Sequence, residues 1–223
     1  RSRATNGWST FPNQGQSGSD TVGEASMYVM FWYQARTARA QTVSPGSVVQ
    51  TTSQYDIYNY DAEPSAGWGN DRVFPYHKGS GEDAQYGYVW VTEWDSEGDA
   101  EEFAEAYGQI LVAQGVPEDE IEDGDELEGE YVIPSGEFAD AFRIDRQGTT
   151  VTIVNAPTAE DLSDVRPAPG DGSDDGASGD GTDGTAATGD GGDASTTATA
   201  DDESGSTGLE APGFGPLTAV LAL

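Results

Sequence analysis

A sharp change in composition at residue 166 constrains the fold of this chain more than any single motif. All but one of its five Trp, ten Tyr and seven Phe residues precede that point, the exception being Phe214. The first 165 residues can therefore build a hydrophobic core. Residues 166–211 contain no aromatic residue and consist mainly of Gly, Ser, Thr, Ala and Asp. Such a segment cannot bury enough apolar surface to offset the entropy lost on ordering. It predicts a disordered acidic stalk with an end-to-end distance of roughly 40 Å.

The charge balance is extreme, with 41 acidic residues against nine Lys or Arg and a net charge of −32. Clustered cations are needed to bind phosphates, so nucleic acid is excluded as a partner and an anionic lipid surface is disfavoured. Lys78 is the only lysine. In roughly 1 M salt the Debye length falls to about 3 Å and screens the self-repulsion, which predicts a protein adapted to high salt. Cysteine is absent, so disulfides and thiolate zinc sites are impossible.

Local patterns predict two long helices and one clear strand. Thr21 and Glu24 have the spacing of a capping box and predict a helix start. The face expected to be buried comprises Val22, Ala25, Tyr28, Val29, Trp32 and Tyr33. Residues 86–94 alternate as a strand. Ser96 and Asp99 then open a second helix, which Gly115 ends. Its apolar stripe is Ala100, Phe103, Ala104, Tyr107, Ile110 and Leu111.

The remaining elements are shorter. Strands are expected near 130–133, 137–145 and 149–154, and a short helix from Thr158. Residues 41–85 are predicted to be turn-rich. The element order indicates an α+β fold with helices packed on a small antiparallel or mixed sheet. The expected divisions are a linker or draped loop at 1–19, the α+β domain at 20–165, the acidic stalk at 166–211 and a truncated sorting signal at 212–223. The chain starts at Arg1 without a leader-like segment, so we expect it to be part of a longer protein.

An apolar end follows the predicted stalk. Pro212-Gly213-Phe214 precedes the residues GPLTAVLAL, which are too few to cross a bilayer as a helix. Stalk, tripeptide and apolar start together resemble the PGF-type C-terminal sorting signal of archaeal surface proteins. The resemblance implies processing by an archaeosortase-type enzyme and attachment to a membrane lipid. The remainder of the hydrophobic helix and the basic cluster of that signal are not present here.

The sequence predicts no catalytic residue and no metal ligand. His77 is the only histidine, and no set of residues at metal-ligand spacing accompanies it. A Ser-His-Asp triad through His77 is possible in principle, but no Gly-x-Ser-x-Gly elbow supports it. The run from Asp119 to Glu130 matches an EF-hand loop only in part, because Ile121 occupies a ligand position. Acidic residues at 95–105 are expected to stabilise a helix start, with a glycosidase-type carboxylate pair as the alternative. The aromatic residues Trp68, Tyr76, Tyr86, Tyr88, Trp90 and Trp94 are interpreted as core, with a ligand groove as the alternative.

Three segments resemble the C-terminal half of a family of secreted and surface proteins. The resemblance spans roughly residues 20–160. It is carried by Gly23 and Glu24, by Gly67, Trp68, Gly69, Asp71 and Arg72, and by Trp94, Asp95, Asp99 and Phe103. In that family these segments follow a metalloprotease-like domain with an HExxH helix. The resemblance implies zinc in an upstream region. No such helix occurs here, so no zinc ligand can be assigned to this chain.

Two of these residues have alternative interpretations. Asp71 and Arg72 are expected to form a structural ion pair, or else to face a substrate. Glu24 is interpreted as a capping acid rather than a third metal ligand.

The function predicted from these patterns is that of a non-catalytic C-terminal region of a lipid- or membrane-anchored surface protein from a haloarchaeon. It would assist an upstream metallopeptidase-like domain. The alternative is a stand-alone binding or structural module of the cell envelope, such as an S-layer component, with no enzymatic partner.

Overall fold

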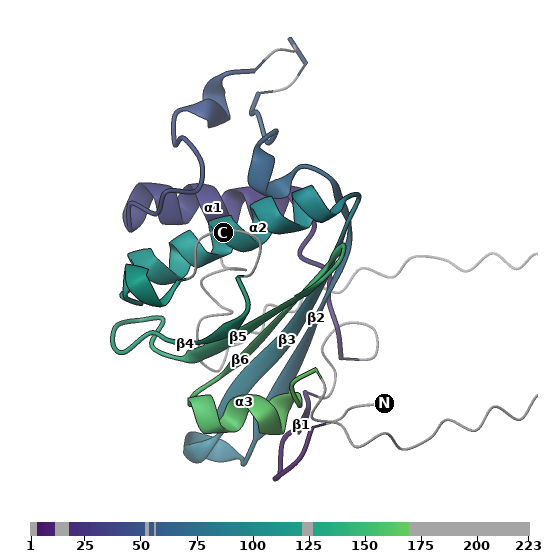
Figure 1. Cartoon of the computed structure of the whole chain (residues 1–223), viewed down its shortest axis with the longest axis vertical. Helices are drawn as coiled ribbons and strands as arrows, with labels where there is room; N and C mark the ends of the chain where they lie inside the picture. The colour runs from purple at the N-terminus through teal and green to yellow at the C-terminus, as the bar shows by residue number, and fades with distance from the viewer. Residues whose placement is uncertain (1–3, 12–17, 52–53, 56, 122–126, 170–223) are drawn as a thin grey trace, which may run out of the picture.

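The computed structural model describes residues 4–11, 18–51, 54–55, 57–121 and 127–169. They form a six-stranded antiparallel sheet with two long helices on one face and a short helix on the other (Figure 1). The strand order is β1-β2-β3-β6-β5-β4. The strands are β1 (Ser9–Thr10), β2 (Trp68–Lys78), β3 (Gln85–Trp94), β4 (Gly129–Val132), β5 (Ala141–Gln147) and β6 (Thr150–Ala156). The helices are α1 (Glu24–Thr37), α2 (Glu97–Ala113) and α3 (Ala159–Val165).

The α+β class is confirmed, but the prediction of a small sheet is wrong. The largest omission is β2, an 11-residue strand that pairs with β3 from Trp68 to Lys78. Gly67, Gly69 and Pro75 made this region resemble a series of turns. The strand tolerates Pro75 because β1 pairs with β2 only through Ser9 and Thr10, beside His77 and Tyr76. Pro75 lacks an N–H donor, but its carbonyl accepts the Phe11 N–H at 2.9 Å.

The strand–helix unit from β3 through α2 agrees with its prediction. Ser96 caps α2, with its Oγ accepting the Asp99 N–H at 3.2 Å and donating to Asp99 Oδ2 at 2.7 Å. The whole predicted stripe from Ala100 to Leu111 is buried. Gly115, with φ of 111°, follows the helix in the left-handed region that favours glycine. Gly148 likewise turns β5 into β6 with φ of 59°.

Two predictions for the first helix are wrong. Gly23 is the N-cap of α1, with φ of 79°, and no capping box forms between Thr21 and Glu24. The buried residues of α1 are Met27, Tyr28, Met30, Phe31 and Gln34, so of the face predicted from periodicity only Tyr28 is fully buried. Apolar residues occupy nearly every side of this helix, and the pattern alone therefore could not fix its orientation.

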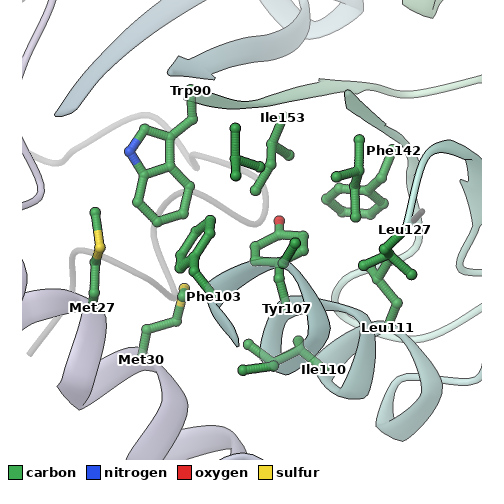
Figure 2. Close-up of a cluster of buried hydrophobic side chains, with 14 of the residues drawn as sticks. Met27, Met30, Trp90, Phe103, Tyr107, Ile110, Leu111, Leu127, Phe142 and Ile153 are labelled. Carbon is green, nitrogen blue, oxygen red and sulfur yellow. The ribbon is translucent and has the colours of Figure 1, made fainter. Parts of the chain in front are cut away.

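The two faces of the sheet support two separate cores. Alternation along β3 directs Tyr88 and Trp90 towards α1 and α2, and Val89 towards α3. Figure 2 shows the larger core, with Phe103 of α2 between Trp90 of the sheet and Met30 of α1. The core interpretation of Tyr76, Tyr88, Trp90 and Trp94 is confirmed by their burial, whereas Trp68 and Tyr86 are half-buried.

The segment at residues 4–11 lies against α3 (Figure 1). The Thr5 N–H donates to the Asp164 carbonyl at 2.8 Å, and Asn6 Nδ2 donates to the Asp164 carboxylate at 2.6 Å. Trp8 is buried in the second core. Both ends of the described domain are therefore tied together on one face of the sheet. Among the described residues, no helix has the length and apolarity needed to cross a bilayer. The predicted stalk beyond residue 169 and the sorting signal lie outside the described residues.

Candidate functional site

A buried carboxylate lies where β2 meets the start of α1. Asp71 is only 2% exposed. Its Oδ1 accepts hydrogen bonds from the Gly23 N–H at 2.9 Å and from Trp68 Nε1 at 3.2 Å. Its Oδ2 accepts from the Val22 N–H at 2.8 Å and from Trp90 Nε1 at 3.1 Å. Four N–H donors from three parts of the chain therefore converge on one side chain.

This carboxylate fixes the backbone just before α1, where the sequence predicted a capping box of Thr21 and Glu24. It binds the backbone N–H groups of the N-cap residue and of the residue before it. A negative charge at this position also interacts favourably with the helix dipole. Thr21 contributes differently, because its Oγ1 donates to the Asp71 carbonyl at 3.2 Å. The end of α1 is thus fixed to the sheet by a residue that lies 48 positions away from the N-cap.

Strand geometry explains why Asp71 and its neighbour have different surroundings. Successive side chains of a strand point to opposite faces, so Asp71 is buried while Arg72 is exposed. The expected Asp71–Arg72 ion pair is not among the ion pairs of the described residues. A substrate-facing Asp71 is equally inconsistent with its burial.

The segments behind the family resemblance meet at this corner. The Gly67 carbonyl accepts the Asp95 N–H at 2.8 Å. Gly67 has φ of 72°, and a Cβ at this position would overlap the Asp99 carboxylate. Gly69 passes close to the Glu93 carbonyl, which a Cβ would approach to 3.2 Å. The glycines are therefore required for close packing of the start of β2 against the end of β3.

Phe103 and Trp94 form the apolar side of the same corner. The Phe103 ring lies 4.8 Å from the Trp94 ring and 5.4 Å from the Trp90 ring, measured between centroids. Trp94 donates its indole N–H to Thr92 Oγ1 at 2.8 Å. Glu24 is exposed on the first turn of α1. The motif residues thus make a structural joint between α1, β2, β3 and α2, which we call the Asp71 corner.

The Asp71 corner has little capacity for chemistry. A carboxylate offers about four lone-pair directions, and four N–H donors occupy them here. No lone pair remains to bind a metal ion or to remove a proton from a substrate. Across the described residues, no group of three or more His, Asp or Glu side chains is arranged to hold a metal ion. Part of the partial EF-hand match, residues 122–126, lies outside the described residues.

A second polar cluster, which sequence reasoning missed, lies at the margin of the larger core. The hydroxyl groups of Tyr88 and Tyr107 are 3.2 Å apart and buried. Burial raises the pKa of Tyr107 to about 12 and that of Tyr88 well above its usual range, so both remain protonated. Nearby, Asn155 Nδ2 donates to Asp140 Oδ2 at 3.2 Å. Burial raises the pKa of the Asp140 carboxyl to about 6, against the lowering effect of this hydrogen bond. No sequence pattern marks Asp140, which ends a polar turn.

His77 lies beside Ser9 on the edge of the sheet. His77 Nε2 and Ser9 Oγ are 3.2 Å apart, and the two residues are cross-strand partners. A nucleophile–base pair also needs a group that orients the base. Within the described chain, no carboxylate hydrogen-bonds to the imidazole. The pair is therefore a cross-strand contact that stabilises β1, and the triad interpretation gains no support.

The α3 face contains the ion pairs of Lys78 and Arg143. Lys78 Nζ lies 3.1 Å from Asp161 Oδ1 and 5.8 Å from the centroid of the Trp8 ring. Arg143 is buried, with Nε 3.1 Å from Asp145 Oδ2, and Nη2 donates to the Arg166 carbonyl at 2.7 Å. The latter bond places a positive charge at the C-terminus of α3, where the helix dipole favours it. Lys78 and Arg143 therefore both attach α3 to the sheet.

A protein-family model matches most of the chain. No curated protein and no solved structure matches the chain. The match is a family described as a domain of unknown function (DUF8575), and it covers residues 2–166. This range includes the N-terminal segment that packs on α3 and ends where α3 ends. The chain belongs to the DUF8575 family.

Proposed function

We propose that this chain is a non-catalytic module of an archaeal surface protein, held away from the membrane by its acidic tail. The observation that carries the proposal is the composition: a net charge of −32 with a single lysine, and a Gly/Ser/Thr/Asp-rich tail that leads to Pro212-Gly213-Phe214. The domain itself, residues 1–165, has 30 acidic residues against eight Lys or Arg. A compact domain with such an excess of acids is suited to concentrated salt, where its repulsion is screened. The residues of the Asp71 corner make structural contacts, which supports the proposal that the module is non-catalytic. Asp71, the most buried acid among them, has no free lone pair.

The proposed attachment follows from the resemblance of residues 212–223 to a PGF-type signal. An archaeosortase-type enzyme would process the chain near the tripeptide and transfer it to a membrane lipid. The tail between the domain and the tripeptide would act as a flexible spacer.

The proposed role is to assist an upstream metallopeptidase-like domain, which would supply any zinc chemistry. The same tether would equally serve a structural module of the cell envelope without an enzymatic partner. The upstream reading frame distinguishes the two, since an HExxH helix is expected in the first case only.

Intact-mass analysis of the C-terminal peptide tests the attachment. In a haloarchaeal host that expresses the complete gene, the mature protein should lack the residues after the signal and carry a lipid. Phe214→Ser should leave the C-terminus unprocessed and the protein unmodified, whereas Ala222→Ser, away from the tripeptide, should be processed normally. A mature protein that retains Leu223 and carries no lipid in wild type would overturn the proposal.

Near-ultraviolet circular dichroism tests the salt requirement. We expect the aromatic signal to be lost as salt falls below about 0.1 M, where the Debye length exceeds about 10 Å. An uncharged osmolyte at matched osmolarity is the control, because it does not screen carboxylates. Full retention of the signal at low salt would contradict halophilic adaptation.

A further inference from the structure

A tight turn at Asn6 and Gly7 shapes the segment that packs on α3. The two residues have φ of 49° and 89°, and the Trp8 N–H donates to the Thr5 carbonyl at 2.9 Å. Positive φ at both central residues is typical of a type I′ turn, for which Asn-Gly is a preferred pair. Asn6 and Gly7 are both exposed, whereas Trp8 is buried.

The Asn6 side chain helps to hold this turn on α3. Its Nδ2 donates to Asp164 Oδ1 at 2.6 Å, and Thr5 Oγ1 donates to the same oxygen at 3.2 Å. The Thr5 N–H donates to the Asp164 carbonyl at 2.8 Å, and we call these three bonds the Asp164 clamp. The clamp holds Trp8 in the second core, where its Nε1 donates to Asp161 Oδ1 at 3.3 Å. Residue 6 must therefore supply an uncharged donor between two acidic residues of α3.

The dipeptide Asn6-Gly7 is also chemically labile. Asn6 is the only asparagine of the chain that glycine follows. Asparagine is a thermolabile residue, and glycine has no Cβ to hinder attack by its own backbone nitrogen. The Gly7 nitrogen attacks Asn6 Cγ and a cyclic imide forms, while the bond from Cγ to Nδ2 breaks and ammonia leaves with the proton of Gly7. Water then opens the imide and leaves a carboxylate, either as aspartate or as its β-linked isomer.

The Asp164 clamp restrains this reaction without preventing it. The bond to Asp164 occupies the Asn6 amide, so the attack proceeds when the turn leaves α3. Segments near the end of a domain open at the smallest free-energy cost in a fold. β1, the strand that follows the turn, has only two residues. Occasional opening of residues 4–8 is therefore expected while the rest of the sheet stays closed.

We propose that Asn6 is a site of spontaneous deamidation and that its conversion releases residues 4–8 from α3. The product carboxylate has no donor to offer, and it faces the Asp164 carboxylate at a position where a hydrogen bond of 2.6 Å had formed. Two like charges at this separation repel each other, and salt weakens the repulsion. Deamidation thus adds charge at the point where the two ends of the domain meet. Neither the reaction nor the release depends on the membrane tether.

Storage of the wild-type chain in concentrated salt at mildly alkaline pH tests the reaction. Tandem mass spectrometry of proteolytic peptides should locate the mass gain of one deamidation at Asn6 before any appears at Asn59 or Asn155. A synthetic peptide of residues 4–8 in the same solution sets the rate of the unrestrained reaction. An unmodified Asn6 after about tenfold the time that converts the peptide would overturn the proposal.

Hydrogen exchange of the full chain tests the release. In Asn6→Asp, which mimics the product, the N–H groups of Thr5 and Trp8 should exchange about tenfold or more faster than in wild type. Asn6→Gly is the matched control, because it accepts the same φ and removes the donor without adding charge. Its increase should be smaller, and the difference between the two variants should narrow as salt rises. Near-ultraviolet circular dichroism verifies that both remain folded. An aspartate variant that exchanges no faster than the glycine variant would show that the new charge does not open the clamp, and the proposed release would be wrong.

Discussion

The two faces of the sheet are stabilised in different ways. The face under α1 and α2 buries a cluster of 23 hydrophobic residues, whereas the face under α3 buries eight. Among the described residues Asp71 is the one fully buried carboxylate, and on the larger face it is satisfied by neutral N–H donors. The smaller face instead uses Lys78 and Arg143, two of the nine cationic side chains in the chain. The comparison shows that the smaller core is supplemented by two cationic contacts, from Lys78 to Asp161 and from Arg143 to Asp145.

The sharpest test of this contrast is Asp71→Ala. It leaves two indole N–H groups and two backbone N–H groups near α1 without their acceptor. Each buried unsatisfied donor costs about 1–3 kcal/mol, so we expect the free energy of unfolding to fall by about 4 kcal/mol or more. Chemical denaturation at constant high salt measures it. Asp71→Asn keeps one acceptor oxygen and should cost less. A loss below about 1 kcal/mol for the alanine variant would show that the Asp71 corner is dispensable.

Truncation of one central residue on each face compares the two cores directly. Phe103→Ala removes the ring that contacts Phe31, Trp90, Trp94 and Tyr107, and should cost about 4 kcal/mol. Leu162→Ala on α3 opens a smaller cavity, and we expect about 2–3 kcal/mol. Both values come from denaturant midpoints with unchanged slopes. Equal losses at the two positions would break the proposed asymmetry.

Asp140→Asn tests whether the charge of the partly buried Asp140 carboxylate destabilises the folded chain. The folded-state pKa of Asp140, about 6, lies above the unfolded value of about 3.9, so the charged form destabilises the folded chain above pH 6. This penalty is relieved as pH falls towards 4. The polar groups that bear on this carboxyl are Asn155, Tyr88 and Tyr107.

The asparagine variant should therefore be more stable than wild type by about 1 kcal/mol at pH 7.5, after allowance for solvent screening. The difference should vanish near pH 4, as measured by parallel thermal unfolding. A constant difference across this range would assign the effect to packing rather than to charge.

The smallest expected effect belongs to Lys78→Met. It removes the Asp161 ion pair and the cation over Trp8 but keeps most of the apolar stem. Because the lysine is partly exposed, we expect a loss of about 1 kcal/mol that shrinks as salt rises. Arg166→Met supplies a control at an arginine whose backbone carbonyl, not its side chain, accepts from Arg143. A loss that is independent of salt would argue for packing of the stem as the main contribution.

Local sequence patterns were sufficient where an element carries its own boundary residues. Ser96, Asp99 and Gly115 define α2, and Thr158 with Asp161 defines α3, in each case through contacts within a few residues. Patterns failed where the determinant is distant. The backbone at the start of α1 is held by Asp71 of β2. No residue near Thr21 indicates that this contact comes from a distant strand.

The same limit applies to β2 and to the candidate site. Gly67 and Gly69 are typical of turns in isolation, and only the neighbouring β3 and α2 explain them as points of close approach. The sequence did not predict that the three segments behind the resemblance lie together, nor what role their residues have. That role depends on which side of β2 faces the helices, and a bulge between Trp68 and Asn70 shifts the register there.

The bond between Thr5 and Asp164 has a mechanical consequence. Tension applied to the two ends of the domain would load this contact and its neighbour at Asn6 before it reached any strand. While these bonds hold, little of that force passes through the strands, because all of them lie between Thr5 and Asp164 in the sequence. The contacts at the two ends of the domain therefore shield the sheet from a pull on those ends until the contacts break.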